Sequence, residues 1–157
     1  MKVIAIIQVR IESERFPGKV LMQIPFGNGQ PILKWITDSI MRSEVVDKCI
    51  VATSVKTEND QIEEFCNKYN LQCFRGSEED VLSRFTTITK NEEADVVIRL
   101  TGDNPILDIG ILDKVINRHL GNNSDYTTSY GLPLGMNFEV ISGQSFLNIN
   151  EVTTQDE

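Results

Sequence analysis

Short apolar runs alternate along the chain with segments of helical period. Four runs rich in β-branched residues predict buried strands, at Val3–Ile7, Cys49–Ala52, Leu71–Phe74 and Val96–Leu100. Each run is too short for a helix and nearly continuous in hydrophobicity, as expected of strands that are covered on both faces. The pattern therefore favours a sheet buried between two layers.

Between these runs, apolar residues recur at intervals of three and four, which places them on one face of a helix. The predicted helical faces contain Ile32, Trp35, Ile36 and Ile40; Ile62, Phe65, Cys66 and Tyr69; Val81, Leu82, Phe85 and Ile88; and Ile111, Leu112, Val115 and Ile116. Strand and helix thus alternate four times.

The predicted helices carry recognisable start and stop signals. Pro31 suits a first helical position, Thr57 and Asp60 have capping-box-like spacing, and Ser77 precedes an acidic turn as a candidate cap. The last of the four helices is expected to begin after a cap at Asp108 and to stop at Gly121.

This alternation predicts an α/β fold of three layers, Rossmann-like, with right-handed crossovers and a mainly parallel central sheet. Its ligand site is expected beyond the carboxyl ends of the strands. After Gly121 the chain becomes polar and turn-rich, with weak strand candidates at Tyr126–Ser129 and Phe138–Ile141, which indicates an added edge or antiparallel section. The final "NINEVTTQDE" shows no helix stop and no obvious core element.

Length and charge limit the class of function. The 157 residues suit one domain spanning 1–157, and a net charge of −8 argues against binding to nucleic acid or to an anionic membrane. No apolar stretch reaches membrane-spanning length, and "MKVIAII" is interpreted as a strand and not as a signal. Cys49, Cys66 and Cys73 have neither zinc-site nor disulfide spacing, so a cytoplasmic protein is expected.

The segment that follows the first strand, "QVRIESERFPGK", concentrates groups that bind anions. It presents Gln8, Arg10, Ser13, Arg15 and Lys19. Arginine offers a fork matched to phosphate oxygens, lysine a mobile charge, and the Pro-Gly turn lets the backbone approach a ligand. A solvated turn with chance charge is the alternative. The segment lacks the pattern of a Walker loop, and "GNGQPI" lacks the third Rossmann glycine.

The other strand ends carry candidate residues of lower individual specificity. In "VVIRLTGDNP", Asp103 faces the cationic first loop in the expected topology and is a candidate ligand for Mg²⁺ brought in with phosphates, or else a turn residue. Gly76 permits close approach of a base or sugar, whereas Ser77 has capping as its simpler role; Thr53 and Ser54 offer hydroxyls at the same rim.

Five segments, in order, carry a resemblance to a known family: "IIQVRIESERFPGKVL", "IVATS", "FRGSEEDVLSRF", "VVIRLTGDNPILD" and "GMNFEVIS". Together they resemble the cytidylyltransferases related to the spore-coat polysaccharide protein SpsF and, more distantly, the acylneuraminate and ketodeoxyoctonate cytidylyltransferases. The resemblance implies a GT-A-like nucleotidyltransferase fold that uses CTP and Mg²⁺. Such an enzyme transfers CMP to a sugar acid or sugar phosphate for surface-polysaccharide biosynthesis and releases pyrophosphate.

The resemblance also implies roles for particular residues. Arg10, Lys19 and Asp103 would be catalytic, with Asp103 holding the metal. The nucleotide would be bound by Gln8, Arg10, Ser13, Arg15, Lys19, Thr53, Ser54, Gly76 and Ser77, and the acceptor by Arg99, Asn137 and Glu139. Arg99 has pairing with a structural carboxylate as its alternative. Relatives continue beyond residue 157 with acceptor-binding and dimer-forming segments, so a homodimer is a further expectation.

The chain departs from the family pattern at the first loop. Where relatives usually read A-R-M-G-S-T-R-L-P-G-K, this chain has Glu12 and Glu14, and each would repel a triphosphate by about 1 kcal/mol if it faced inward. Asn137 stands where relatives commonly have Asp. A nucleotide-binding relative without catalysis is therefore the second hypothesis. A glycosyltransferase on the same fold is weaker, because the chain contains no D-x-D.

Overall fold

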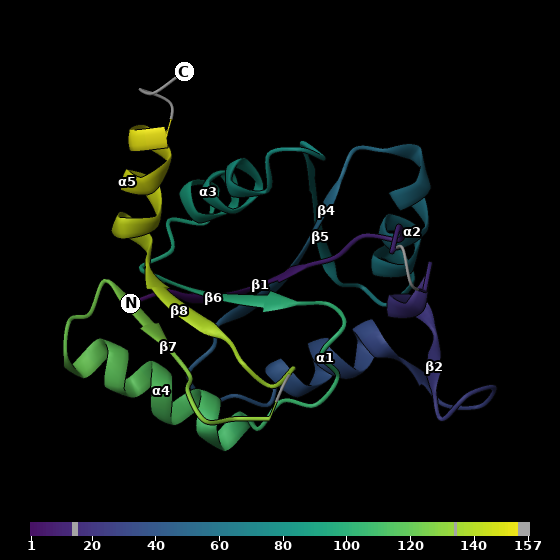
Figure 1. Cartoon of the computed structure of the whole chain (residues 1–157), viewed down its shortest axis with the longest axis horizontal. Helices are drawn as coiled ribbons and strands as arrows, with labels where there is room; N and C mark the ends of the chain where they lie inside the picture. The colour runs from purple at the N-terminus through teal and green to yellow at the C-terminus, as the bar shows by residue number, and fades with distance from the viewer. Residues whose placement is uncertain (14–15, 134, 154–157) are drawn as a thin grey trace.

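The computed structural model describes residues 1–13, 16–133 and 135–153 and has a six-stranded sheet at its centre (Figure 1). The strand order is β5-β4-β1-β6-β8-β7. The strands are β1 (Val3–Gln8), β4 (Lys48–Ser54), β5 (Gln72–Gly76), β6 (Val96–Thr101), β7 (Tyr126–Thr128) and β8 (Glu139–Ser142). The first four of these are mutually parallel, while β8 and β7 add an antiparallel section beyond β6. The predicted strands and mainly parallel sheet are confirmed.

Helices cover both faces of the sheet, and alternate residues of β1 show the division. Val3, Ala5 and Ile7 pack with the apolar faces of α1 (Ile32–Ile40), α2 (Asp60–Lys68) and α4 (Ile109–Gly121). Ile4 and Ile6 point the other way, toward α3 (Val81–Asn91) and α5 (Gly143–Thr153). The three-layer α/β prediction is therefore confirmed, and both cores lie beneath helices (Figure 1).

Short elements join the larger ones. The hairpin of β2 (Gln23–Ile24) and β3 (Gln30–Pro31) forms a small separate sheet before α1. Two 3₁₀ turns, η1 (Lys19–Leu21) and η2 (Thr57–Asn59), follow the first loop and β4 respectively. No helix in the described ranges is long and apolar enough to span a membrane.

The helix starts correct three sequence predictions and support one. Thr57 does not cap α2, because it begins η2, and α2 starts only at Asp60. The cap of α3 is Asp80, whose carboxylate accepts a hydrogen bond from the Ser83 amide at 2.8 Å, and not Ser77. Pro31 is the N-cap that precedes α1 and not its first helical residue, whereas Asp108 caps α4 as predicted.

Of the α-helices in the described residues, α5 is the one that the sequence pattern did not predict. Its Phe146 is buried and stacks on Phe85 of α3, with ring centroids 5.8 Å apart and planes 10° from parallel. Ser142 prepares the helix start, since its hydroxyl accepts a hydrogen bond from the Ser145 amide at 3.1 Å. Phe146 lies just before the final "NINEVTTQDE", for which no core element was expected, and residues 148–153 of that segment complete α5. An aromatic contact with α3, and not a helical period, places this segment in the core.

Candidate functional site

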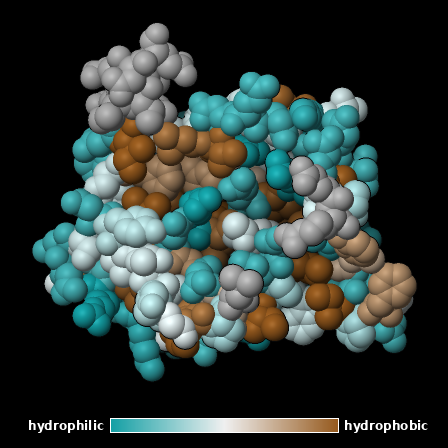
Figure 2. Space-filling model, in the orientation of Figure 1, coloured by the Kyte–Doolittle hydropathy of each residue, from teal (hydrophilic) through white to brown (hydrophobic). Residues whose placement is uncertain are grey.

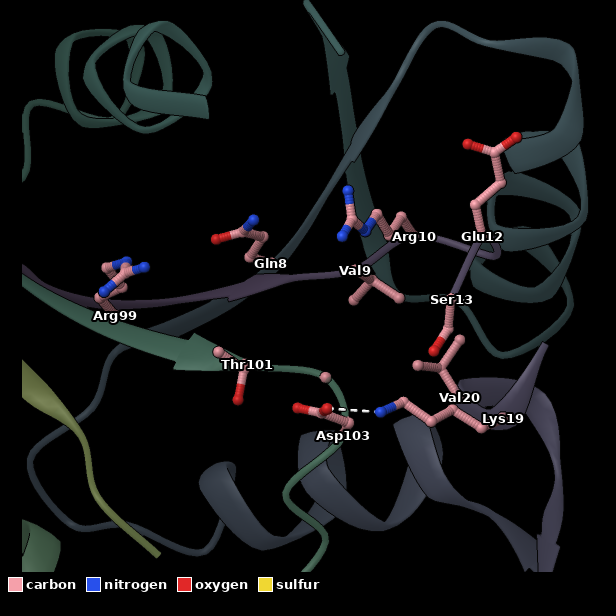
Figure 3. Close-up of a pocket in the computed structure, with 11 residues that line it drawn as sticks. Gln8, Val9, Arg10, Glu12, Ser13, Lys19, Val20, Arg99, Thr101 and Asp103 are labelled. Atoms are coloured by element: carbon pink, nitrogen blue, oxygen red, sulfur yellow. Dashed lines mark hydrogen bonds and ion pairs between the residues drawn. The ribbon is translucent and has the colours of Figure 1, made fainter. Parts of the chain in front are cut away.

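A polar cleft of about 480 Å³ opens beyond the carboxyl ends of the central strands β1 and β6. Its lining comes from β1 with the loop after it and from the end of β6: Gln8, Val9, Arg10, Glu12, Ser13, Lys19, Val20, Arg99, Thr101, Gly102 and Asp103 (Figure 3). On this face, hydrophilic residues border the hollow at the middle of the molecule (Figure 2). The cleft lies where a parallel α/β sheet is expected to bind its ligand.

Lys19 and Asp103 meet across this cleft. The Lys19 ammonium donates a hydrogen bond to Asp103 Oδ2 at 2.6 Å, joining residues 84 positions apart (Figure 3). This hydrogen bond is the main reason that the pKa of the Asp103 carboxyl lies below its ordinary value, although partial burial opposes the shift. The side chains keep 31% and 41% of their surface exposed, so a ligand in the cleft can reach both.

The backbone of the first loop aims Lys19 at the cleft. Gly18 adopts φ 71°, a left-handed conformation that favours glycine, and its amide donates to the Ile11 carbonyl at 2.8 Å, which closes the loop. Lys19 then opens η1, and the buried side chain of Val20 fixes that turn to the core. The backbone turn at Gly18 and Lys19 is thus fixed, while the long Lys19 side chain can still move its ammonium within the cleft.

The opposite wall depends on Gly102. Its amide donates to the Gln8 carbonyl at 2.9 Å, which continues the pairing of β6 with β1 past the last strand residue. A Cβ at this position would stand 2.8 Å from Val9 Cγ2. Glycine therefore lets the two strand ends approach closely, and Asp103 follows at once, opposite Lys19.

The cleft brings together much of the predicted nucleotide-binding set. Gln8, Arg10, Ser13 and Lys19 all line it, while Arg15 and Glu14 lie outside the described residues. Glu12 also borders the cleft, but its carboxylate points away from the Lys19–Asp103 pair in Figure 3 and lies 3.5 Å from the Lys56 ammonium. The Lys56 charge thus offsets the repulsion expected of Glu12.

Thr53 and Ser54 do not lie at the rim where the sequence reasoning placed them. Both side chains are 0% exposed. Ser54 instead accepts a hydrogen bond from Asn59 Nδ2 at 2.7 Å, and Asn59 Oδ1 accepts one from the Ile11 amide at 2.9 Å. A hydroxyl enclosed in this way supports the first loop from beneath and does not reach a ligand in the cleft.

Asn59 is the site residue that sequence reasoning missed. It is buried, and it connects the end of β4 to the backbone of the first loop through the two hydrogen bonds just described. Hydrophobic periodicity gives no signal for such a residue. The only available hint was an asparagine in the turn between a strand ending in "ATS" and the next helix.

Gly76 and Ser77 lie at the end of β5, outside the lining of the cleft. A Cβ on Gly76 would stand 2.7 Å from Arg84 Cγ, so glycine leaves room for the stem of a buried arginine. The Ser77 hydroxyl accepts a hydrogen bond from the Asp80 amide at 3.1 Å and orders the turn before α3. A nucleoside role for these two residues stays a prediction.

Arg99 forms a network with the antiparallel section of the sheet. It lies opposite Glu139 in the β6–β8 register and donates to Glu139 Oε2 at 2.5 Å, while the Tyr126 hydroxyl donates to Oε1 at 2.8 Å. Burial raises the pKa of the Glu139 carboxyl, but the hydrogen bonds from Arg99 and Tyr126 outweigh it and lower the pKa overall. Arg99 lines the cleft; Asn137 is exposed and does not.

The donor set of the cleft fits a hard cation that arrives with its ligand. Among the described residues there is no cluster of three or more His, Cys, Asp or Glu side chains able to hold a metal. Asp103 offers one ionised carboxylate on a polar wall, and Mg²⁺ commonly takes only one or two carboxylates together with phosphate oxygens and water. Asp103 is therefore the residue that would hold Mg²⁺.

Comparison with known proteins gives a consistent result. The family described as cytidylyltransferase matches residues 4–153. The spore coat polysaccharide biosynthesis protein SpsF of Bacillus subtilis is 36% identical over 158 residues, which cover 99% of this chain and 65% of that protein. This chain thus spans slightly less than two thirds of the length of that relative.

Solved structures agree. A cytidylyltransferase from Leptospira borgpetersenii is similar with a TM-score of 0.87 and 30% identity, covering 97% of this chain and 65% of that one. A CMP:2-keto-3-deoxy-manno-octonic acid synthetase complexed with CTP matches with a TM-score of 0.78 over 96% of this chain and 78% of that one. At 15% identity, the second likeness supports the fold alone. On the extent of the family match, this chain belongs to the cytidylyltransferase family.

Proposed function

We propose that this protein is a CTP-dependent cytidylyltransferase that transfers CMP to a sugar acid or sugar phosphate and releases pyrophosphate. Besides membership of the family, one structural observation carries the proposal. Lys19 and Asp103 converge across a polar cleft beyond β1 and β6, at 2.6 Å from each other. The place of SpsF among the relatives supports a role in surface-polysaccharide biosynthesis.

The first loop would bind the triphosphate. Arg10, Ser13 and Lys19 present two cations and a hydroxyl to the same cleft, and in a chain of net charge −8 such local cations are needed to attract a polyanion. When CTP enters, the Lys19 ammonium exchanges Asp103 for phosphate oxygens, and the released carboxylate is free for a cation. The ion pair thus keeps both groups in position before the substrate binds.

The reaction needs positioning and charge stabilisation more than covalent chemistry by the protein. An oxygen of the acceptor attacks the α-phosphorus in line, its new P–O bond forms, and the bond to the bridging oxygen of pyrophosphate breaks; an acceptor hydroxyl also loses its proton to water. Lys19 and Arg10 stabilise the negative charge that develops on the leaving pyrophosphate. Mg²⁺ held at Asp103 would supply further electrostatic stabilisation of the phosphates.

The acceptor would lie toward β6 and β8. Arg99 lines the cleft and lies beside Glu139, so an acceptor carboxylate or phosphate has a guanidinium within reach if it competes with Glu139 for the exposed part of that group. The exposed Asn137 does not reach the lining, and its role in acceptor binding stays a prediction.

Nucleotide binding and pyrophosphate release test the proposal. The protein is titrated with CTP, UTP, ATP and GTP by calorimetry with Mg²⁺, and then assayed for pyrophosphate with CTP and a panel of sugar acids and sugar phosphates. We expect CTP to bind and at least one acceptor to release pyrophosphate. Absence of CTP binding would refute the proposal, whereas CTP binding without turnover on any acceptor would favour the nucleotide-binding relative instead.

A further inference from the structure

A row of three polar side chains crosses the antiparallel section of the sheet beside the cleft. Arg99 of β6 lies opposite Glu139 of β8, and Tyr126 of β7 lies opposite Ile141, which places Tyr126 diagonal to Glu139. Diagonal neighbours on one face of an antiparallel pair are within reach of long and aromatic side chains. Three neighbouring strands thus contribute one residue each to a continuous row.

The row lies on the face of the sheet on which the cleft opens. Ile141 and Ile6 both pack in the core beneath α3 and α5. Side chains two residues apart on a strand share a face, so Glu139 and Gln8 lie on that face as well. Gln8 lines the cleft, as does Arg99. The row therefore runs outward from Arg99, which lies at the end of the cleft away from the first loop (Figure 3).

Both oxygens of the Glu139 carboxylate accept a hydrogen bond within this row. Oε1 accepts from the Tyr126 hydroxyl at 2.8 Å, and Oε2 accepts from Arg99 Nη1 at 2.5 Å. A carboxylate held at one oxygen can still rotate about its side chain, whereas two donors from different strands fix its plane. The Tyr126 hydroxyl thus fixes the carboxylate, and the carboxylate orients the guanidinium.

The protonation states of the row maintain this arrangement. Burial raises the pKa of Glu139, but the hydrogen bonds from Arg99 and Tyr126 outweigh burial and lower the pKa overall. Burial and the hydrogen bond to Glu139 raise the pKa of the Tyr126 phenol, so its hydroxyl keeps the proton that it donates. In the described part of the chain, the titratable groups that face Glu139 are Arg99 on β6 and Tyr126 on β7.

Arg99 keeps the capacity to bind a ligand while it is held. Its side chain is 40% exposed, and that of Glu139 is 30% exposed. A guanidinium carries five N–H donors in a planar fork, and the bond to Glu139 is donated by Nη1. A fork that is already oriented loses less side-chain entropy when it binds a carboxylate or a phosphate. Loss of that orientation should therefore weaken binding of an anionic acceptor.

We propose that Tyr126 is a positioning residue for the acceptor: its hydroxyl holds Glu139, which in turn orients the Arg99 guanidinium for the acceptor's carboxylate or phosphate. Tyr126 acts through Glu139 and not on the reacting atoms. This inference rests on the proposed function and adds to it a residue on the edge strand β7, outside the lining of the cleft.

Steady-state kinetics test the inference in wild type, Tyr126→Phe and Tyr130→Phe, with the panel acceptor that releases pyrophosphate fastest. Phenylalanine keeps the ring and removes only the hydroxyl. In Tyr126→Phe we expect KM for the acceptor to rise about 3- to 10-fold, the scale of one lost hydrogen bond, while CTP affinity and melting temperature change little. Tyr130 is the matched control, because it is a nearby tyrosine that is 99% exposed, and its variant should keep the wild-type KM.

The titration of Glu139 gives a second readout that needs no acceptor. Carboxyl ¹³C NMR should show Glu139 titrating at a higher pH in Tyr126→Phe than in wild type or Tyr130→Phe, because one of the two donors that lower its pKa is lost. A protonated Glu139 no longer forms an ion pair with Arg99. The rise in acceptor KM on acidification should therefore begin at a higher pH in Tyr126→Phe.

An unchanged titration of Glu139 in Tyr126→Phe would overturn the inference, because the hydroxyl would then not hold the carboxylate. An unchanged acceptor KM in Tyr126→Phe, or an equal rise in Tyr130→Phe, would overturn it as well and leave the transfer reaction intact. Wild type that releases no pyrophosphate with any acceptor would refute the proposed function itself, and the titration alone would then decide whether Tyr126 holds Glu139.

Discussion

The two edges of the parallel sheet hold the same chemical pair, a lysine and a carboxylate, in opposite surroundings. At the amino edge, Glu92 accepts hydrogen bonds from Lys2 at 2.8 Å, from Lys48 at 2.7 Å and from Gln72 at 3.0 Å, and its side chain is only 13% exposed. At the carboxyl edge, Lys19 and Asp103 pair with side chains that are 31% and 41% exposed, so this pair stays accessible.

The difference separates a structural pair from one that can bind a ligand. Glu92 ties together the starts of β1, β4 and β5 through its hydrogen bonds. If Glu92 bound a ligand instead, these links between the strands would break. The Lys19–Asp103 pair closes no such network and costs little to open, because exposed ion pairs contribute only about 0 to 1 kcal/mol. The open pair is therefore suited to exchange partners with a nucleotide.

Removal of Lys19 should produce the largest effect on activity. In Lys19→Ala, the loss of a cation at the developing pyrophosphate charge should lower the rate of pyrophosphate release by roughly 100- to 1000-fold. The melting temperature should change little. Lys56→Ala is the control, since Lys56 is another exposed lysine, which follows β4 and pairs with Glu12 instead of Asp103. Equal losses of pyrophosphate release in both variants would mean that Lys19 contributes no more than any exposed lysine nearby.

Glu92→Gln should give the converse result. Loss of the charge shared by two lysines should lower the free energy of unfolding by about 2 kcal/mol in urea titrations, with pyrophosphate release nearly unchanged. The neighbouring exposed Glu93, replaced by Gln, serves as the control. A large loss of activity without loss of stability would contradict a structural role for Glu92.

The pH dependence of stability should show the same network. Hydrogen bonds from Lys2 and Lys48 lower the pKa of Glu92 to about 2 from an ordinary 4.5. A lowered carboxyl pKa contributes stability that is complete above about pH 4.5 and is lost as the pH falls toward 2. In Glu92→Gln, the urea midpoint of unfolding should therefore depend less on pH between about 4.5 and 2 than it does in wild type. If the urea midpoint fell equally with pH in wild type and variant, Glu92 would not be the source of the pH dependence.

Replacement of Asn59 should have a smaller and indirect effect on nucleotide binding, through the position of the first loop. Asn59→Ala removes the link between Ser54 and the Ile11 amide, so the first loop should bind CTP about tenfold more weakly, with a rise in KM and less change in kcat. Asn67→Ala on the exposed side of α2 is the control. If kcat alone fell, Asn59 would act on the chemical step and not on the position of the loop.

Much of the fold followed from local patterns. The β-branched runs and helical faces predicted all four parallel strands and the first four helices, because each burial pattern is local to its own segment. The topological rule then placed Arg10, Lys19 and Asp103 at one edge of the sheet, and the structure brings them to one cleft. Strand order was not needed for that prediction.

Other features depended on contacts distant in sequence. Helix α5 is held by Phe146 against Phe85, a contact across 61 positions that no periodicity near residue 146 reveals. Thr53 and Ser54 were expected at the rim because they end a strand, but Asn59 closes over Ser54 and both side chains are buried. The direction of the Glu12 carboxylate depends likewise on Lys56.

The sequence by itself determined the layers of the fold, the edge of the sheet at which the polar cleft lies and the cations that line it. These properties depend on the period of hydrophobic residues and on which residues follow each strand. The tertiary structure alone decided which lysine–carboxylate pair is open and which is saturated, and which side chains of neighbouring strands hold one another. Such properties depend on burial and on partners from distant segments, and these exist only after the chain has folded.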